Sequence, residues 1–164
     1  MIWLFRIEQH LEPLAIAANV TQSTFCRLDE VLLTFGGLTM EYNDLRDKRG
    51  GDRVACNAVL NSLEKRWANS DQDVLIAAVI LNPFFKNTPF NPLSRFQPGN
   101  IYNLLLILWN RFFPEKPSPP SLFKNVLDYL RGTGDFDGLG LCVNACLTMC
   151  AQNVIVSLVS SYLR

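Results

Sequence analysis

Apolar side chains recur at helical spacing along most of the first 131 residues, between clear breaks in the chain. The longest stripe has steps of three and four and is made of Leu28, Val31, Leu32, Phe35, Leu38, Tyr42 and Leu45. Such a stripe is typical of an amphipathic helix with one face on a core. Gly36 and Gly37 lie in its middle, and each weakens a helix by about 1 kcal/mol relative to alanine. We therefore expect a kink or a close helix crossing at this point.

Further helices are predicted on both sides of this stripe. The opening stretch has mixed helical spacings, with Pro13 marking a kink or a boundary between two short helices. Ser23-Thr24 are the expected cap of the next helix. After a charged turn over residues 46–53, the segment 54–68 places its apolar residues on one side and is predicted to be a third helix.

The most hydrophobic run of the chain is VLIAAVILNPFF, in which eight apolar residues precede Asn82-Pro83. Asn69-Ser70-Asp71 can cap a helix from about Gln72 to Leu81, which would be apolar nearly all round. A residue before proline avoids the helical region, so Asn82 should end this helix. We expect it to lie in the centre of a helical bundle.

The chain from residue 84 to 99 is predicted to be a loop whose phenylalanines anchor it to the core. These are Phe84, Phe85, Phe90 and Phe96. Asn100 can then cap an apolar helix that Pro114 stops. After a proline-rich connector, Ser121 opens a short amphipathic helix that Gly132 ends.

The last segment, Leu139 to Leu163, contains no charged side chain and is long enough to span a bilayer. Its asparagines, Thr148, Gln152 and three serines lower its hydrophobicity. A buried helix or hairpin is therefore the prediction, and a membrane span is the less favoured alternative.

Charge and cysteine content narrow the classes of function. Fifteen Lys+Arg balance fifteen Asp+Glu in a chain of 164 residues, so no overall positive field attracts nucleic acid, and any DNA contact has to be local. The cysteines number five, and the apolar N-terminal stretch is too short for a secretory signal. These features favour a reducing intracellular location, nuclear or cytoplasmic, with the thiols as small buried side chains.

Residues that could carry catalysis or bind metal do not form a convincing set. Cys142, Cys146 and Cys150 would share one helix face, but a zinc site needs further ligands, and His10 is the single histidine. A serine or cysteine hydrolase also needs a base, most often histidine. We predict that the chain is not an enzyme and has no cofactor, no metal and no small-molecule substrate.

The best local basic patch precedes and includes the third predicted helix. Its members, the candidate DNA contacts, are Lys48, Arg49, Arg53, Lys65 and Arg66. Such residues could contact a phosphate backbone. The alternative is a solvated turn and outer helix face, because Asp47, Asp52 and Glu64 are interleaved with them.

Three stretches resemble one protein family: LEPLAIAANVTQSTFCRLDEVLLTFGGL, NSLEKRWANSDQDVLIAAVILNPFFKNTPFN and NLLLILWNRFF. They look like hAT (hobo/Activator) superfamily transposases, in particular those of mushroom-forming fungi. The resemblance covers roughly residues 10 to 136. Its two most specific parts are SLEKRW followed by DQDVLIAAVILNPFFK, and the spaced LAIAANVTQ and CRLDEVLLTFG before them. Its signature residues are Trp67, Leu81, Asn82, Pro83 and Phe84.

In that family a ribonuclease H-like core holds an acidic triad around two metal ions and carries a long helical insertion. The resemblance implies that residues 1–136 are an all-α bundle of about six helices derived from this insertion, without any triad residue, and that residues 137–164 are a divergent tail on a transposon remnant. It further implies weak binding of DNA or of other transposase-like chains. The alternative is a stand-alone helical interaction protein or membrane-associated protein that acts through its apolar tail.

Overall fold

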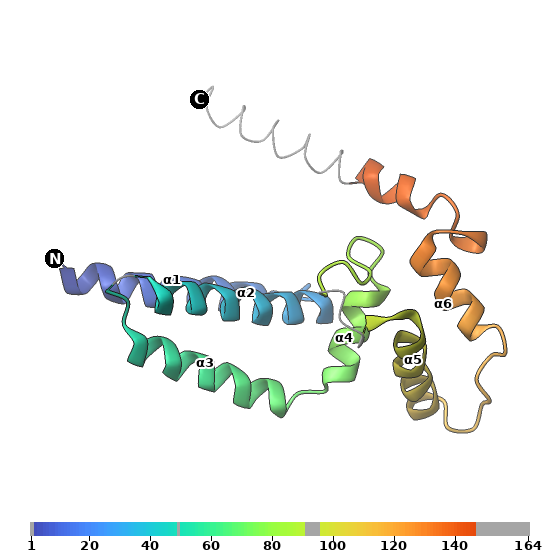
Figure 1. The fold of residues 1–164 in the computed structure, drawn as a ribbon, viewed down its shortest axis with the longest axis horizontal. Helices are drawn as coiled ribbons and strands as arrows, with labels where there is room; N and C mark the ends of the chain where they lie inside the picture. The colour runs from blue at the N-terminus through green and yellow to red at the C-terminus, as the bar shows by residue number, and fades with distance from the viewer. Residues whose placement is uncertain (1, 49, 91–95, 147–164) are drawn as a thin grey trace. The chain divides into compact units, whose positions relative to one another are not determined.

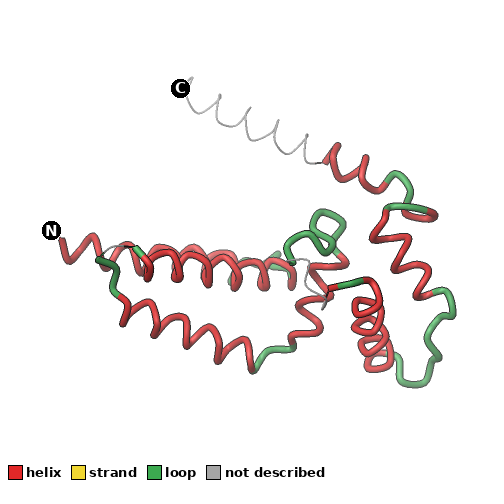
Figure 2. The backbone as a smooth tube through the Cα atoms, viewed as in Figure 1, coloured by secondary structure: helices red, strands yellow, loops and turns green. Residues whose placement is uncertain are grey.

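The computed structural model describes residues 2–48, 50–90 and 96–146, with the backbone alone for residues 2–6. All regular secondary structure in these ranges is helical, which confirms the all-α class (Figures 1 and 2). The elements are α1 (Ile2–Thr21), α2 (Leu28–Asp47), α3 (Arg53–Ala68), α4 (Gln72–Leu81), α5 (Pro98–Phe112), α6 (Leu122–Arg131), the 3-10 helix η2 (Gly134–Phe136) and a helical stretch over 139–146. They divide into two compact units, Met1–Val79 and Ile80–Arg164.

The first unit contains three long helices, and α2 packs against α1 and against α3 (Figure 1). Its core is formed by Tyr42, Leu45 and Cys56, with Leu14 of α1 packed against them. The Tyr42 hydroxyl donates a hydrogen bond to the carbonyl of His10. This bond ties α2 to α1 at the level of the core, because Tyr42 is fully buried.

The start of α2 differs from the prediction. Instead of Ser23-Thr24, Arg27 is the residue that precedes the helix, and its backbone N–H donates to a Glu30 carboxylate oxygen at 3.1 Å. The Arg27 guanidinium also donates to the carboxylate of Asp29 at 3.0 Å. Two carboxylates in the first turn offset the positive end of the helix dipole, so the helix begins where they cluster.

Two expected interruptions of the first unit are absent. The prediction of a helix boundary at Pro13 is wrong, because α1 continues through this residue from Ile2 to Thr21. A close helix crossing at Gly36 and Gly37 is also wrong, because α2 is continuous and a β carbon at either glycine would meet no atom within 4 Å. The glycines therefore leave space beside α2 and do not bring another helix close.

Helix α4 has the bounds that the apolar run predicts. The Asp71 carboxylate accepts a hydrogen bond from the Val74 N–H at 3.4 Å, as expected of a residue that caps a helix. Val79 is 0% and Ile80 is 1% exposed, in keeping with a helix that is apolar on every side. Asn82 ends the helix: its side-chain oxygen accepts the Phe84 N–H at 2.9 Å and so starts a turn.

In the second unit α5 packs against α6, and α6 against η2. The predicted cap at Asn100 is wrong, because α5 begins earlier, with Gln97 before it and Pro98 in its first turn. Proline fits there since its missing N–H would have no partner within the helix. The bounds of α6 are confirmed: Ser121 precedes it, and Gly132 ends it with a left-handed φ of 68°.

The prediction that phenylalanines anchor the loop after α4 to the core is wrong for Phe84. Phe84 is 44% exposed, and it therefore does not anchor the loop in the core. Phe90 and Phe96 stack on one another with ring centroids 4.3 Å apart. Aromatic side chains in this loop thus bury surface partly against each other.

The cysteine prediction holds for Cys56, which is buried, and is wrong for Cys142 and Cys146, which are exposed. Both lie in the helical stretch 139–146, where nearly every side chain is exposed. Cys150 and the rest of the charge-free segment from residue 147 onward lie outside the described residues. Within the described ranges no helix combines the length and the apolar character needed to cross a bilayer.

Candidate functional site

The predicted basic patch is divided between the two ends of α3. Lys48 follows the last residue of α2 and Arg53 is the first residue of α3, whereas Lys65 and Arg66 belong to the last turn of α3. With a rise of 1.5 Å per residue, the backbones of Arg53 and Lys65 are about 18 Å apart. Arg49 lies outside the described residues. The structure therefore places the candidate DNA contacts in two separate groups.

Acidic side chains surround the group at the start of α3. Asp52 caps the helix, accepting the Ala55 N–H at 3.0 Å. Asp47 accepts a hydrogen bond from Arg46 at 3.0 Å, and this bond, with the charges of Arg46 and Arg53, lowers the pKa of the Asp47 carboxyl. Carboxylates thus offset the positive charge at this end, as on an ordinary solvated surface.

The group at the end of α3 is more open. Lys65 and Arg66 are both exposed, and among the described residues neither forms an ion pair. Basic side chains in the last turn of a helix complement the negative end of its dipole. This role within the helix accounts for both residues without any ligand.

The family-signature residues build the turns at the two ends of α4. The carbonyl of Trp67 accepts hydrogen bonds from the Ser70 hydroxyl at 2.8 Å and from the Gln72 amide at 3.2 Å. At the other end Asn82 and Pro83 form the turn that follows the helix, and Leu81 is 53% exposed. The Trp67 carbonyl and the Asn82 side chain thus take part in the turns on either side of α4.

His10, the single histidine, lines a small hollow of about 170 Å³ near the start of α3, together with Lys48 and Asp52. Burial raises the pKa of the nearby Cys56 thiol, the opposite of what an activated cysteine nucleophile requires. Across the part of the chain that the structure describes, no three His, Cys, Asp or Glu side chains gather as metal ligands do.

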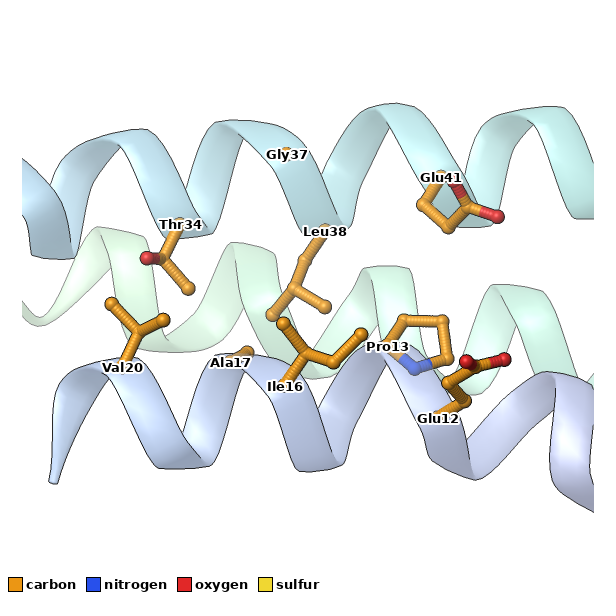
Figure 3. A pocket seen from close by; sticks show the side chains of 9 residues that line it. All are labelled: Glu12, Pro13, Ile16, Ala17, Val20, Thr34, Gly37, Leu38 and Glu41. Atoms are coloured by element: carbon orange, nitrogen blue, oxygen red, sulfur yellow. The ribbon is translucent and has the colours of Figure 1, made fainter. Parts of the chain in front are cut away.

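The most developed surface feature of the first unit is a groove between α1 and α2, here called the α1–α2 groove (Figure 3). Its volume is about 380 Å³. The lining residues are Glu12, Pro13, Ile16, Ala17 and Val20 of α1 and Thr34, Gly37, Leu38 and Glu41 of α2. Most of this surface is apolar, and its side chains project toward one another across the groove (Figure 3).

Gly37 is one of the lining residues of this groove and adds no side chain to it. Apart from its chain neighbours and the backbone of its own helix, no described atom lies within 4 Å of the position that its β carbon would occupy, so a side chain there would project away from the described chain. The neighbouring Gly36 lines a second hollow, between α2 and α3, of about 320 Å³. The Gly36-Gly37 pair therefore opens α2 on two sides, a consequence that the sequence signalled only as a weak point in the helix.

The α1–α2 groove combines exposed apolar side chains with two acidic side chains. Ile16 and Val20 are 58% and 38% exposed. Glu12 and Glu41 lie together at one end, whereas Val20 and Thr34 lie at the other (Figure 3). No basic side chain lines the groove, and within the described ranges neither glutamate forms an ion pair. The arrangement suits an apolar ligand with a positive charge at one end.

No protein-family model, no curated protein and no solved structure matches this chain. The resemblance to hAT transposases therefore stays a prediction based on the quoted stretches.

Proposed function

We propose that this protein is a non-catalytic helical interaction domain whose α1–α2 groove binds an amphipathic helix of a protein partner. The observation that carries the proposal is the empty space beside Gly37 in a continuous helix. Glycine in a helix is unfavourable by about 1 kcal/mol relative to alanine. Since no described atom of another segment lies within 4 Å of this position, the space is available to a partner.

A helix is the partner element that fits this site. An amphipathic helix places apolar side chains into a groove at steps of three and four residues. Burying the exposed parts of Ile16 and Val20 would contribute about 25 cal/mol for each Å² of apolar surface removed from water. The absent side chain at Gly37 lets the partner approach the backbone of α2 closely.

The two glutamates specify the charge of the partner. Glu12 and Glu41 lie at the same end of the groove, so a lysine or arginine at one end of the bound helix would be attracted to both (Figure 3). Such complementarity contributes mainly to specificity and to the association rate. The partner is therefore a basic amphipathic helix.

The direct test uses a fluorescent synthetic peptide of about five helical turns, with leucines at steps of three and four and lysines elsewhere. Fluorescence anisotropy measures its affinity for the protein, for Gly37→Leu and for Gly36→Leu. Leucine is a good helix former, and at either site its β carbon would meet no described atom of another segment within 4 Å. Gly37→Leu should lower the affinity at least about tenfold, or 1.4 kcal/mol. Gly36→Leu, which fills the opposite side of α2, should leave it unchanged.

A second pair of variants tests the charge preference. Glu12→Lys with Glu41→Lys should weaken binding of the lysine peptide and strengthen binding of the same peptide with glutamates. The control, Glu8→Lys with Asp44→Lys, changes the net charge equally at exposed positions of the same helices that do not line the groove. Equal responses from both pairs, or equal binding to Gly37→Leu and Gly36→Leu, would contradict the proposal.

Descent from a hAT transposase insertion domain and contact with DNA also stay proposals. The first is supported by the sequence resemblance. The second is supported by the exposure of Lys65 and Arg66 at the end of α3. In the transposase interpretation, the partner of the groove is another transposase-like chain.

A further inference from the structure

The second unit contains a hollow of its own, where the end of α4 meets α5 and α6. Its volume is about 320 Å³, within the lower part of the range of small-molecule sites, which begins at roughly 300 Å³. The walls come from Ile80 at the end of α4, from Ile101 and Leu105 of α5, and from Leu122 and Val126 of α6.

A hydrogen bond holds the walls of this hollow in place. The Tyr129 hydroxyl of α6 donates to the carbonyl of Ile80 at 3.0 Å. That carbonyl is among the last of α4, which have no partner within their helix, so the bond satisfies a buried acceptor. Phe136 of η2 packs edge-on against the Tyr129 ring with centroids 5.3 Å apart.

The lining is almost entirely hydrocarbon. Ile80 and Ile101 are each 1% exposed, and Val126 is 5% exposed. The Tyr129 hydroxyl donates to the carbonyl of Ile80, and the amide nitrogen of the exposed Asn125 donates to the Ser121 hydroxyl at 3.4 Å, so the Asn125 amide oxygen is the acceptor that a ligand can use. Leu81, 53% exposed, also lines the hollow, so the site opens at the surface.

The lining of the hollow contains no charged side chain that could pair with a charged ligand. At the exposed Asn125 an alcohol hydroxyl can donate a hydrogen bond to the amide oxygen, whereas a carboxylate only accepts hydrogen bonds and cannot. The nearest described cation that contacts a wall residue is Lys86, whose ammonium lies 5.3 Å from the centroid of the Tyr129 ring. Lys86 does not line the hollow. A ligand with a neutral head group is therefore the better fit.

We propose that the hollow between α4, α5 and α6 binds a small, uncharged apolar molecule of the medium-chain alcohol class. The hydrocarbon chain lies between α5 and α6, and a single neutral polar group lies at the Asn125 amide. This site belongs to the second unit, so it is independent of the α1–α2 groove.

The test titrates the full chain with 1-octanol and, separately, with octanoate, which has the same chain length and a negative charge. Methyl NMR spectra report binding through the signals of Ile101, Leu105 and Val126. Octanol should shift these signals in a saturable way, and octanoate should bind at least about tenfold more weakly. Absence of saturable shifts with octanol, or equal affinity for both molecules, would overturn the proposal.

Two tryptophan variants on the same helix locate the site. Leu105→Trp fills the hollow and should abolish the octanol response, whereas Ile107→Trp should not, because Ile107 is 56% exposed and does not line it. Circular dichroism checks that both variants keep their helix content. If Leu105→Trp unfolds, Leu122→Phe takes its place as the filling variant. Octanol binding that survives in a folded filling variant, or that is lost in Gly37→Leu, would also overturn the assignment.

Discussion

The α1–α2 groove and the hollow between α5 and α6 are both largely apolar and similar in size, about 380 and about 320 Å³, but different features of the chain produce them. The first lies between two long helices, and its lining includes one position without a side chain, Gly37. The second arises where the end of α4 meets α5 and α6, around the bond from Tyr129 to Ile80. The comparison teaches that the groove can be filled without disturbing the fold, whereas the hollow depends on packing that also stabilises its unit.

The largest expected effect is the loss of stability when a side chain in the wall of the hollow is shortened. Ile101→Ala removes a side chain that is 1% exposed, and should lower the free energy of unfolding by about 2–5 kcal/mol. Ile107→Ala, at a 56% exposed position of the same helix, should change it by less than about 0.5 kcal/mol. Urea denaturation followed by circular dichroism measures both. Similar values for the two variants would show that the hollow is not part of a packed core.

The next effect concerns the bond that closes the hollow. Tyr129→Phe leaves the Ile80 carbonyl without its donor and should destabilise the protein by about 1–3 kcal/mol. Urea denaturation at neutral pH measures this difference, and Tyr102→Phe on α5 provides a tyrosine control.

The same tyrosine predicts a dependence on pH. Burial raises the pKa of Tyr129 to about 12 from an ordinary value of 10.0. The folded state therefore holds this proton more tightly, and the stability linked to it is fully present below pH 10 and is lost as the pH rises toward 12. Tyr129→Phe should lose less stability than the unchanged protein over this interval. An identical decline in both would disprove the link.

Alanine substitutions compare Gly36 and Gly37, where a β carbon is tolerated, with Gly132, where the backbone conformation requires glycine. Gly36→Ala and Gly37→Ala should each raise stability by up to about 1 kcal/mol, because helix propensity improves and no atom is displaced. Gly132→Ala should instead lower stability by about 1 kcal/mol, because a φ of 68° disfavours a β carbon. Thermal unfolding distinguishes the two directions. Destabilisation at Gly37 would mean that the space beside it is not free.

The smallest expected effect is on the affinity for DNA. With the basic residues in two groups, few phosphates are contacted at once, so log affinity should fall with log salt at a slope of about −2. Titration of labelled DNA at low and moderate salt measures this slope for the protein and for Lys65→Glu with Arg66→Glu. Charge reversal at Lys65 and Arg66 should weaken DNA binding more than charge reversal at the other group does, in Lys48→Glu with Arg53→Glu. A steep slope would instead indicate one continuous DNA-binding surface.

Elements with strong local signals could be predicted closely from the sequence. The apolar run and the Asn82-Pro83 stop defined α4, and Ser121 and Gly132 defined α6. Predictions failed where a distant or competing interaction decided the local structure. Arg27 with Asp29 and Glu30 begins α2 in place of Ser23-Thr24, and α1 tolerates Pro13 as part of a long packed helix.

The candidate sites were less predictable than the helices. Lys48, Arg53, Lys65 and Arg66 are close in sequence, but a straight helix of 16 residues separates them in space. The α1–α2 groove combines residues from two helices, and its sequence signal, Gly37, equally predicted a close crossing.

The sequence by itself determined the all-α class and most helix bounds, because helix periodicity, caps and proline stops act over a few residues. The tertiary structure decided which side of each helix stays open, because that depends on which atoms of other segments occupy the space beside it. Gly37 shows this most directly: its missing side chain is evident in the sequence, but only the packing of α1 against α2 makes it a groove.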